Sequence, residues 1–147
     1  MSSAPRHGNP RRYVLDANAL IAFFEDRAVA AARVERLVAQ ALRQDLPLLM
    51  SAVNWGEVFS TAWRRHGEAR ARQVDARLRE MPIVVIAVDR ECATRAAALK
   101  QKHNLGYADA FAAELAIERG AWLVTADPEF VKLGKTLSLY ALPRHEK

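Results

Sequence analysis

Cysteine is nearly absent from this sequence of 147 residues, because Cys92 is the only one. A single cysteine excludes an intrachain disulfide and a zinc site built from several thiolates. Cys92 lies in a predicted helix, and we interpret it as a small core or interface residue. The histidines show none of the paired spacings typical of metal ligands, so we expect all four at the surface: His7, His66, His103 and His145.

Long hydrophobic runs and several common catalytic signatures are also absent. No apolar stretch is long enough to span a bilayer and no signal peptide is recognisable, so we expect a soluble cytoplasmic protein without a membrane partner. The chain has no Gly-rich phosphate loop, no G-x-S-x-G motif and no nucleophilic cysteine paired with a histidine.

Internal repeats and linkers are missing too, and 147 residues is the usual size of one domain. The first ten residues are polar and contain two prolines. We therefore expect a disordered leader over residues 1–11 and a single domain over residues 12–147.

What the chain does have is an ample apolar fraction and an excess of positive charge. Its hydrophobic fraction is 51%, its formal net charge is +5 and its pI is about 9.8. A basic surface favours a polyanionic partner such as nucleic acid. An arginine-rich composition can also reflect genome base composition, so charge alone is a weak indicator.

Apolar strand patterns alternate with helical patterns along the whole chain. The predicted strands cover residues 12–16, 48–50, 83–88, 121–125 and 137–140, the last at an edge. The predicted helices cover residues 17–24, 27–44, 52–66, 68–80, 89–102, 107–119 and 128–133. Apolar strands separated by helices predict an α/β fold, with a central parallel sheet of four to five strands and helices on both faces.

Four acidic residues each fall just after a predicted strand or in the first two turns of a predicted helix: Asp16, Glu57, Asp109 and Asp127. Sites in parallel sheets form at the carboxyl ends of the strands, so these side chains can meet at one edge. Four carboxylates in one place repel each other unless a hard divalent cation neutralises them. The pattern therefore predicts metal-assisted chemistry on a phosphate.

Each of these residues also has a structural interpretation. An acidic residue after a strand commonly caps a helix, and Glu57 lies opposite an aromatic stripe, which by itself indicates a solvated face. Asn18 and Thr125 lie two positions from Asp16 and Asp127, where they could orient a carboxylate or a metal-bound water. Their alternatives are a helix-start residue and a β-forming residue.

Arginines are frequent from Arg64 to Arg79. Arg64 and Arg65 are candidates for contact with an RNA backbone. A solvated helix face with intrahelical salt bridges to nearby acids is an equal alternative, and no aromatic residues alternate with the arginines to support base stacking.

Two further groups of side chains have uncertain environments in the sequence. Trp55, Phe59 and Trp63 form one stripe, which can belong to the core or to a contact surface. Glu114 and Glu118 are interpreted as ordinary helix surface.

Four segments carry a family resemblance: VLDAN (14–18), SAVNWGEV (51–58), YADA (107–110) and TADPEF (125–130). In order and spacing they resemble the acidic motifs of PIN-domain ribonucleases, and chain length favours the VapC toxins of bacterial toxin–antitoxin pairs. The resemblance extends over residues 12–142. It implies a three-layer α/β sandwich and an endoribonuclease dependent on Mg²⁺ or Mn²⁺.

The resemblance also implies a homodimer and inhibition by a VapB-like antitoxin, which would plug the acidic pocket with a basic side chain. By motif position, Asp16, Glu57, Asp109 and Asp127 would bind the metal and act in catalysis, with Thr125 and Asn18 assisting. The RNA target and the number of ions stay open.

Three hypotheses about activity follow. The first is hydrolysis of RNA phosphodiester bonds by a water activated at the metal. The second is a catalytically inactive module of the same fold that binds nucleic acid or a partner. The third is a receiver-like phospho-acceptor or small phosphatase. Such sites need a lysine or a further aspartate at the sheet edge, and neither Lys132 nor Lys135, the nearby lysines, directly ends a strand.

Overall fold

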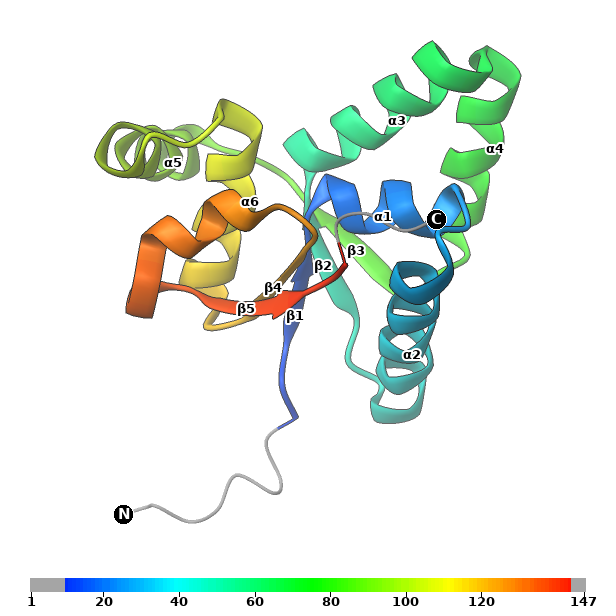
Figure 1. The fold of residues 1–147 in the computed structure, drawn as a ribbon, viewed down its shortest axis with the longest axis horizontal. Helices are drawn as coiled ribbons and strands as arrows, with labels where there is room; N and C mark the ends of the chain where they lie inside the picture. The colour runs from blue at the N-terminus through cyan, green and yellow to red at the C-terminus, as the bar shows by residue number, and fades with distance from the viewer. Residues whose placement is uncertain (1–9, 144–147) are drawn as a thin grey trace.

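The chain forms a five-stranded parallel sheet with helices on both faces, as the computed structural model of residues 10–143 shows (Figure 1). The strands are β1 (Tyr13–Leu15), β2 (Leu48–Ser51), β3 (Ile83–Ile86), β4 (Trp122–Thr125) and β5 (Ser138–Ala141). Their spatial order is β3-β2-β1-β4-β5, and every neighbouring pair is parallel. The predicted α/β class and parallel sheet are confirmed.

The helices divide into two groups around this sheet. They are α1 (Ala17–Phe24), α2 (Ala28–Gln44), α3 (Ala52–His66), α4 (Glu68–Arg79), α5 (Arg90–His103), α6 (Tyr107–Arg119) and the 3₁₀ segment η2 (Pro128–Thr136). Helices α1 to α4 lie on one side of the sheet, and α5, α6 and η2 lie on the other (Figure 1). Each side has its own hydrophobic cluster.

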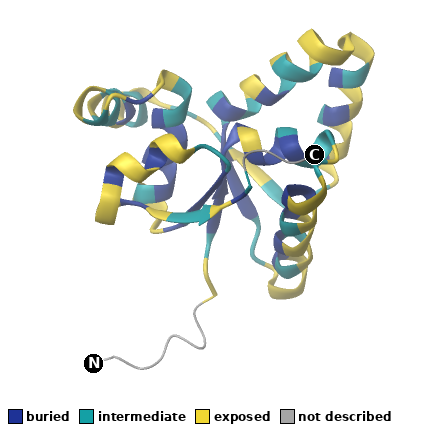
Figure 2. Cartoon of the chain, viewed as in Figure 1, coloured by how far each residue is buried: buried dark blue, intermediate teal, exposed yellow. Residues whose placement is uncertain are grey.

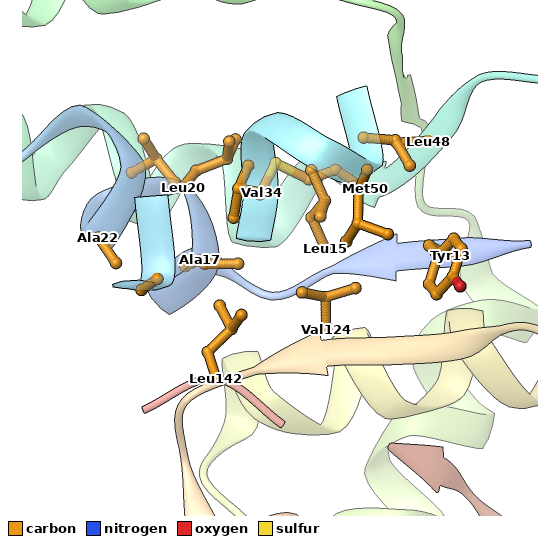
Figure 3. Close-up of a cluster of buried hydrophobic side chains, with 14 of the residues drawn as sticks. Tyr13, Leu15, Ala17, Leu20, Ala22, Val34, Leu48, Met50, Val124 and Leu142 are labelled. Carbon is orange, nitrogen blue, oxygen red and sulfur yellow. The ribbon is translucent and has the colours of Figure 1, made fainter. Parts of the chain in front are cut away.

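The central strand β1 contributes to both clusters because successive side chains of a strand point to opposite faces. Tyr13 and Leu15 pack on the α1–α2 side, whereas Val14 packs on the α6 side. On the α1–α2 side, Leu15 lies beside Met50 of β2 and Val124 of β4 (Figure 3). Burial on both faces explains why these strands are continuous apolar runs rather than alternating patterns. Buried residues accordingly concentrate along the sheet (Figure 2).

The edges of the sheet differ in detail from the prediction. Strand β3 ends at Ile86 instead of residue 88, and Val84 and Val85 are exposed because β3 is an edge strand. The segment predicted as a short helix over 128–133 is a 3₁₀ helix that runs to Thr136, with a kink at Gly134.

Residues 1–9, most of the predicted leader, lie outside the described residues, as do His7 and His145. None of the helices between residues 10 and 143 combines the length and apolar character needed to cross a membrane.

Candidate active site

A cavity of about 620 Å³ opens where β1 and β4 end and α1, α3 and α6 approach one another. All four acidic candidates line it: Asp16, Glu57, Asp109 and Asp127. Asn18, exposed in the first turn of α1, lies on the same wall. The cavity collects side chains that are up to 111 positions apart in the sequence, which is a direct result of the parallel sheet topology.

Asp16 is the most buried of the four acids, with 1% of its surface exposed. It follows β1 and caps α1, since its Oδ1 accepts a hydrogen bond from the Ala17 N–H at 2.8 Å. Its Oδ2 accepts a hydrogen bond from the Thr125 hydroxyl at 2.7 Å. Burial raises the pKa of Asp16 to about 7, although the Thr125 hydrogen bond opposes that shift and the charges of Asp109 and Glu57 add to it.

Thr125 connects two of the acids. Its buried hydroxyl donates to Asp16 and accepts a hydrogen bond from the Asp127 N–H at 2.9 Å. Asp127 Oδ1 in turn accepts from the Glu129 N–H at 2.9 Å and so caps η2. A threonine at this position therefore does more than favour a strand, because it fixes one carboxylate and the backbone of another.

Asp109 lies in the first turn of α6, where buried alanines bring the helix close to the sheet. Partial burial raises the pKa of Asp109 to about 6, and the charges of Asp127, Glu57 and Glu129 raise it further. Gly106 is the N-cap residue of α6, and a Cβ atom at this position would lie 3.2 Å from Asp109 Oδ2. A larger residue there would therefore crowd the Asp109 carboxylate.

Asn54 holds the two helices of the site together, a role that the sequence did not reveal. It is fully buried in α3, and its Nδ2 donates to the Ala108 carbonyl at 3.0 Å and to Glu57 Oε1 at 3.4 Å. Its Oδ1 has no partner among residues 10–143. The only signal in the sequence was a polar residue one turn before Glu57.

Two arginines also line the cavity, Arg27 and Arg65. Arg65 was an RNA-contact candidate from the sequence, whereas Arg27 was not recognised because nothing in its neighbourhood distinguishes it. Arg64, the other candidate, is exposed on α3 and is not part of the lining. Further along, Arg72 and Arg79 form the intrahelical pairs expected of a solvated face.

The interpretation of Glu114 as helix surface was wrong. Only 3% of its side chain is exposed, because α5 packs on this face of α6 and supplies its partners. Arg95 Nε donates to Glu114 Oε2 at 2.8 Å, and Cys92 Sγ lies 2.9 Å from Oε1. Burial, together with that hydrogen bond, raises the pKa of Cys92 to about 12, so the thiol stays protonated. Glu118 is exposed, as predicted.

Lys132 and Lys135, the lysines considered for a phospho-acceptor site, lie outside the cavity lining. Lys132 pairs with Glu129 and donates to the Asn104 carbonyl at 3.2 Å.

The donor set of the cavity suits a hard divalent cation, which prefers carboxylate oxygens. Burial is the main cause that raises the pKa values of Asp16 and Asp109, and the charges of neighbouring acids raise them further. Within the described residues, however, no three His, Cys, Asp or Glu side chains already lie close enough to hold a metal ion. To bring three carboxylates around one ion, at least one side chain must rotate. Glu57 has the most freedom to do so, because it is exposed on α3.

The family model described as "PIN domain" matches residues 13–136. No curated protein matches the sequence.

Several solved structures share the fold. A toxin–antitoxin complex from Klebsiella pneumoniae is similar with a TM-score of 0.64 and 23% identity, over 88% of this chain and 99% of that one. VapC20 from Mycobacterium tuberculosis, described as a sarcin–ricin loop cleaving toxin, has a TM-score of 0.69 and 17% identity, over 83% and 95%. VapBC2 from Rickettsia felis, bound to a promoter DNA fragment, has a TM-score of 0.68 and 17% identity, over 88% and 98%.

Proposed function

This chain belongs to the PIN-domain family, and from that premise we propose that it is a metal-dependent endoribonuclease acting as the toxin of a type II toxin–antitoxin pair. The observation that carries the proposal is the single cavity lined by four carboxylates from four separate parts of the chain. The similar folds of toxin–antitoxin structures support the biological role.

The four acids Asp16, Glu57, Asp109 and Asp127 would hold Mg²⁺ or Mn²⁺. When bound, the ion lowers the pKa of a water molecule and offsets negative charge that develops on the phosphate. Thr125 keeps the Asp16 carboxylate in one orientation through its 2.7 Å hydrogen bond. Asn18, exposed on the same wall, is available to orient a water or a phosphate oxygen.

The proposed partners are RNA, a VapB-like antitoxin and a second copy of the chain. An antitoxin would insert a basic side chain among the acids, because a cation there replaces the missing counter-charge. For the homodimer, the aromatic stripe on α3 is a candidate contact. Trp55 and Phe59 are half-buried, whereas 44% of Trp63 is exposed.

A catalytically inactive binding module of the same fold is the alternative. One observation favours it, namely that no three acids within the described part of the chain are already placed to hold an ion.

Cleavage of total RNA by the purified chain separates the two functions. We expect cuts that require Mg²⁺ or Mn²⁺, disappear with excess chelator and fall at least about 100-fold in Asp16→Asn. Glu118→Gln, which changes an exposed acid of α6 outside the cavity, is the matched control and should cleave normally. Cleavage that persists in chelator would refute metal dependence. A folded protein that binds RNA yet cuts nothing with either ion would establish the binding module.

A further inference from the structure

The cavity has a basic wall as well as an acidic one. Arg27 precedes α2 and Arg65 lies in the last turn of α3, and both line the same cavity as the four acids. Glu25, the C-cap residue of α1, pairs with both of them. Three parts of the chain therefore bring these residues together, and both arginines, though not Glu25, line the proposed active site.

Glu25 binds one arginine with each carboxylate oxygen. Arg27 Nη2 donates to Oε1 at 2.8 Å, and Arg65 Nη1 donates to Oε2 at 2.7 Å. Only 23% of the Glu25 side chain is exposed, against 38% for Arg27 and 41% for Arg65. Burial opposes the charge of Glu25, but the hydrogen bonds from Arg65 and Arg27 prevail and lower its pKa, so it remains an anion at neutral pH.

This pairing leaves most of the donor capacity of the arginines unused. A guanidinium has five N–H donors in a planar fork, and each arginine uses one N–H group on Glu25. Within residues 10–143, the ion pairs of both arginines are with Glu25 and with none of the four cavity acids. Two guanidinium groups carry two positive charges and Glu25 carries one negative charge, so this wall has a net positive charge. The N–H donors that Glu25 does not use can form bidentate hydrogen bonds to a phosphate.

The two walls carry opposite charges, and a polyanion interacts with them differently. Without an ion, the acids repel an RNA strand, so attraction within the cavity comes from the arginines. The volume of about 620 Å³ is within the range of small-molecule sites and exceeds what one phosphate fills. The cavity therefore has room for more of an RNA strand than the single phosphate presented to the acids.

We propose that Arg27 and Arg65, aligned by Glu25, form a phosphate-binding wall that holds the RNA phosphate next to the one presented to the acids. This inference rests on the proposed function of the cavity. The two arginines contact the substrate directly, and Glu25 is a positioning residue that acts through them.

Binding of a short labelled single-stranded RNA to the full chain in EDTA tests the arginines without turnover. At low salt we expect Arg27→Ala and Arg65→Ala each to weaken binding about 10-fold. Each should also reduce the slope of log K against log salt concentration by about 0.7, the value for one lost phosphate contact on a single strand. Arg72→Ala is the control, because Arg72 pairs with Glu68 at 3.4 Å on α4, away from the cavity, and it should change affinity less than about 2-fold.

Glu25→Gln separates alignment from simple charge. The substitution removes a negative charge beside the cavity, so electrostatics alone would tighten RNA binding. If Glu25 aligns the guanidinium groups, binding instead weakens about 3- to 10-fold, because a glutamine oxygen can accept from one arginine while its amide repels the other. Tighter binding by Glu25→Gln would overturn the positioning role.

Arg65→Lys tests whether the guanidinium geometry matters beyond its charge. This variant should keep part of the salt slope but not the full affinity, since an ammonium lacks the planar fork of N–H donors.

Kinetics with Mg²⁺ distinguishes failure of this inference from failure of the nuclease. The arginine variants should raise KM more than they lower kcat, whereas Asp16→Asn should lower kcat. Normal cleavage with unchanged KM and salt slope in both arginine variants would overturn the phosphate wall and leave the nuclease intact. If the unsubstituted chain binds RNA but never cuts it, and the arginine variants lose that binding, the phosphate wall would stand and the nuclease would be overturned. Variants that bind RNA normally but escape the antitoxin would assign the arginines to the protein partner and overturn the inference.

Discussion

Asp16 combines two roles that sequence analysis had treated as alternatives. One oxygen caps α1 through the Ala17 N–H, and the other accepts a hydrogen bond from the hydroxyl of Thr125, a buried residue that does not itself line the cavity. A helix cap fixes the carboxylate at the end of β1, which is where a functional acid needs to be. Asp127 repeats the arrangement, because it caps η2 while lining the same cavity.

Replacement of Thr125 by valine tests the connection between these acids. Thr125→Val keeps the shape but removes the donor to Asp16 and the acceptor of the Asp127 N–H. We expect a loss of about 1–3 kcal/mol in the free energy of unfolding, because the buried Asp16 carboxylate and the partly buried Asp127 N–H lose their partner. Urea denaturation at neutral pH measures it. Thr125→Ser, which keeps the hydroxyl, should recover most of the loss, and equal stability of valine and serine variants would contradict the assignment.

Helix α6 carries Asp109, and its position depends on neighbours on two sides. Asn54 ties it to α3 through the Ala108 carbonyl, and the Glu114–Arg95 pair ties it to α5. Asn54 and Glu114 are the buried members of these links, and a buried polar group that loses its partner costs more than a lost surface contact.

Removal of Arg95 leaves the buried Glu114 carboxylate without its cation. We expect Arg95→Ala to lower the free energy of unfolding, measured by urea denaturation, because the buried Glu114 carboxylate loses its cation. Arg95 is also 3.6 Å from Glu118, which is 48% exposed. Glu118→Gln is therefore the control and should cost less than about 1 kcal/mol. If adding Glu114→Gln to Arg95→Ala restored no stability, the unpaired charge would not be the cause.

The elements of the fold could be predicted from local patterns, but the links between helices could not. The runs around Leu15, Leu49 and Leu123 are apolar on both faces, and that pattern alone predicts central parallel strands. Glu114 looks like a surface residue in the sequence, because helical periodicity does not show which other helix packs on that face. Glu25 was missed for the same reason, because one of its two partners, Arg65, comes from another helix.

At the scale of the whole molecule, the cavity acids make stability depend on pH. Asp16 and Asp109 have pKa values of about 7 and 6 in the folded protein against a usual 3.8. Between these values the folded state holds protons that the unfolded state releases, so stability falls as pH rises. Glu25, with a lowered pKa, acts in the opposite direction only at more acidic pH.

In EDTA, we therefore expect the free energy of unfolding to fall by about 3 kcal/mol as the pH is raised from about 5 to about 8. Asp16→Asn should flatten most of this dependence, since its amide has no charge to lose. Mg²⁺ or Mn²⁺ should raise the melting temperature of the unsubstituted chain most at the upper end of this range, because the ions bind only the folded state. A melting temperature that does not change with pH in EDTA would contradict the burial of Asp16 and the raised pKa values of the two acids.

The strand order has a consequence for synthesis of the chain. Strand β1 is made first but lies at the centre of the sheet, and β4, one of its two neighbours, begins only at Trp122. A nascent or prematurely terminated chain that stops before this point leaves β1 open on one side and lacks Asp127 altogether. The four-acid cavity can therefore form only after synthesis has passed Asp127, so the proposed activity would be absent from shorter translation products.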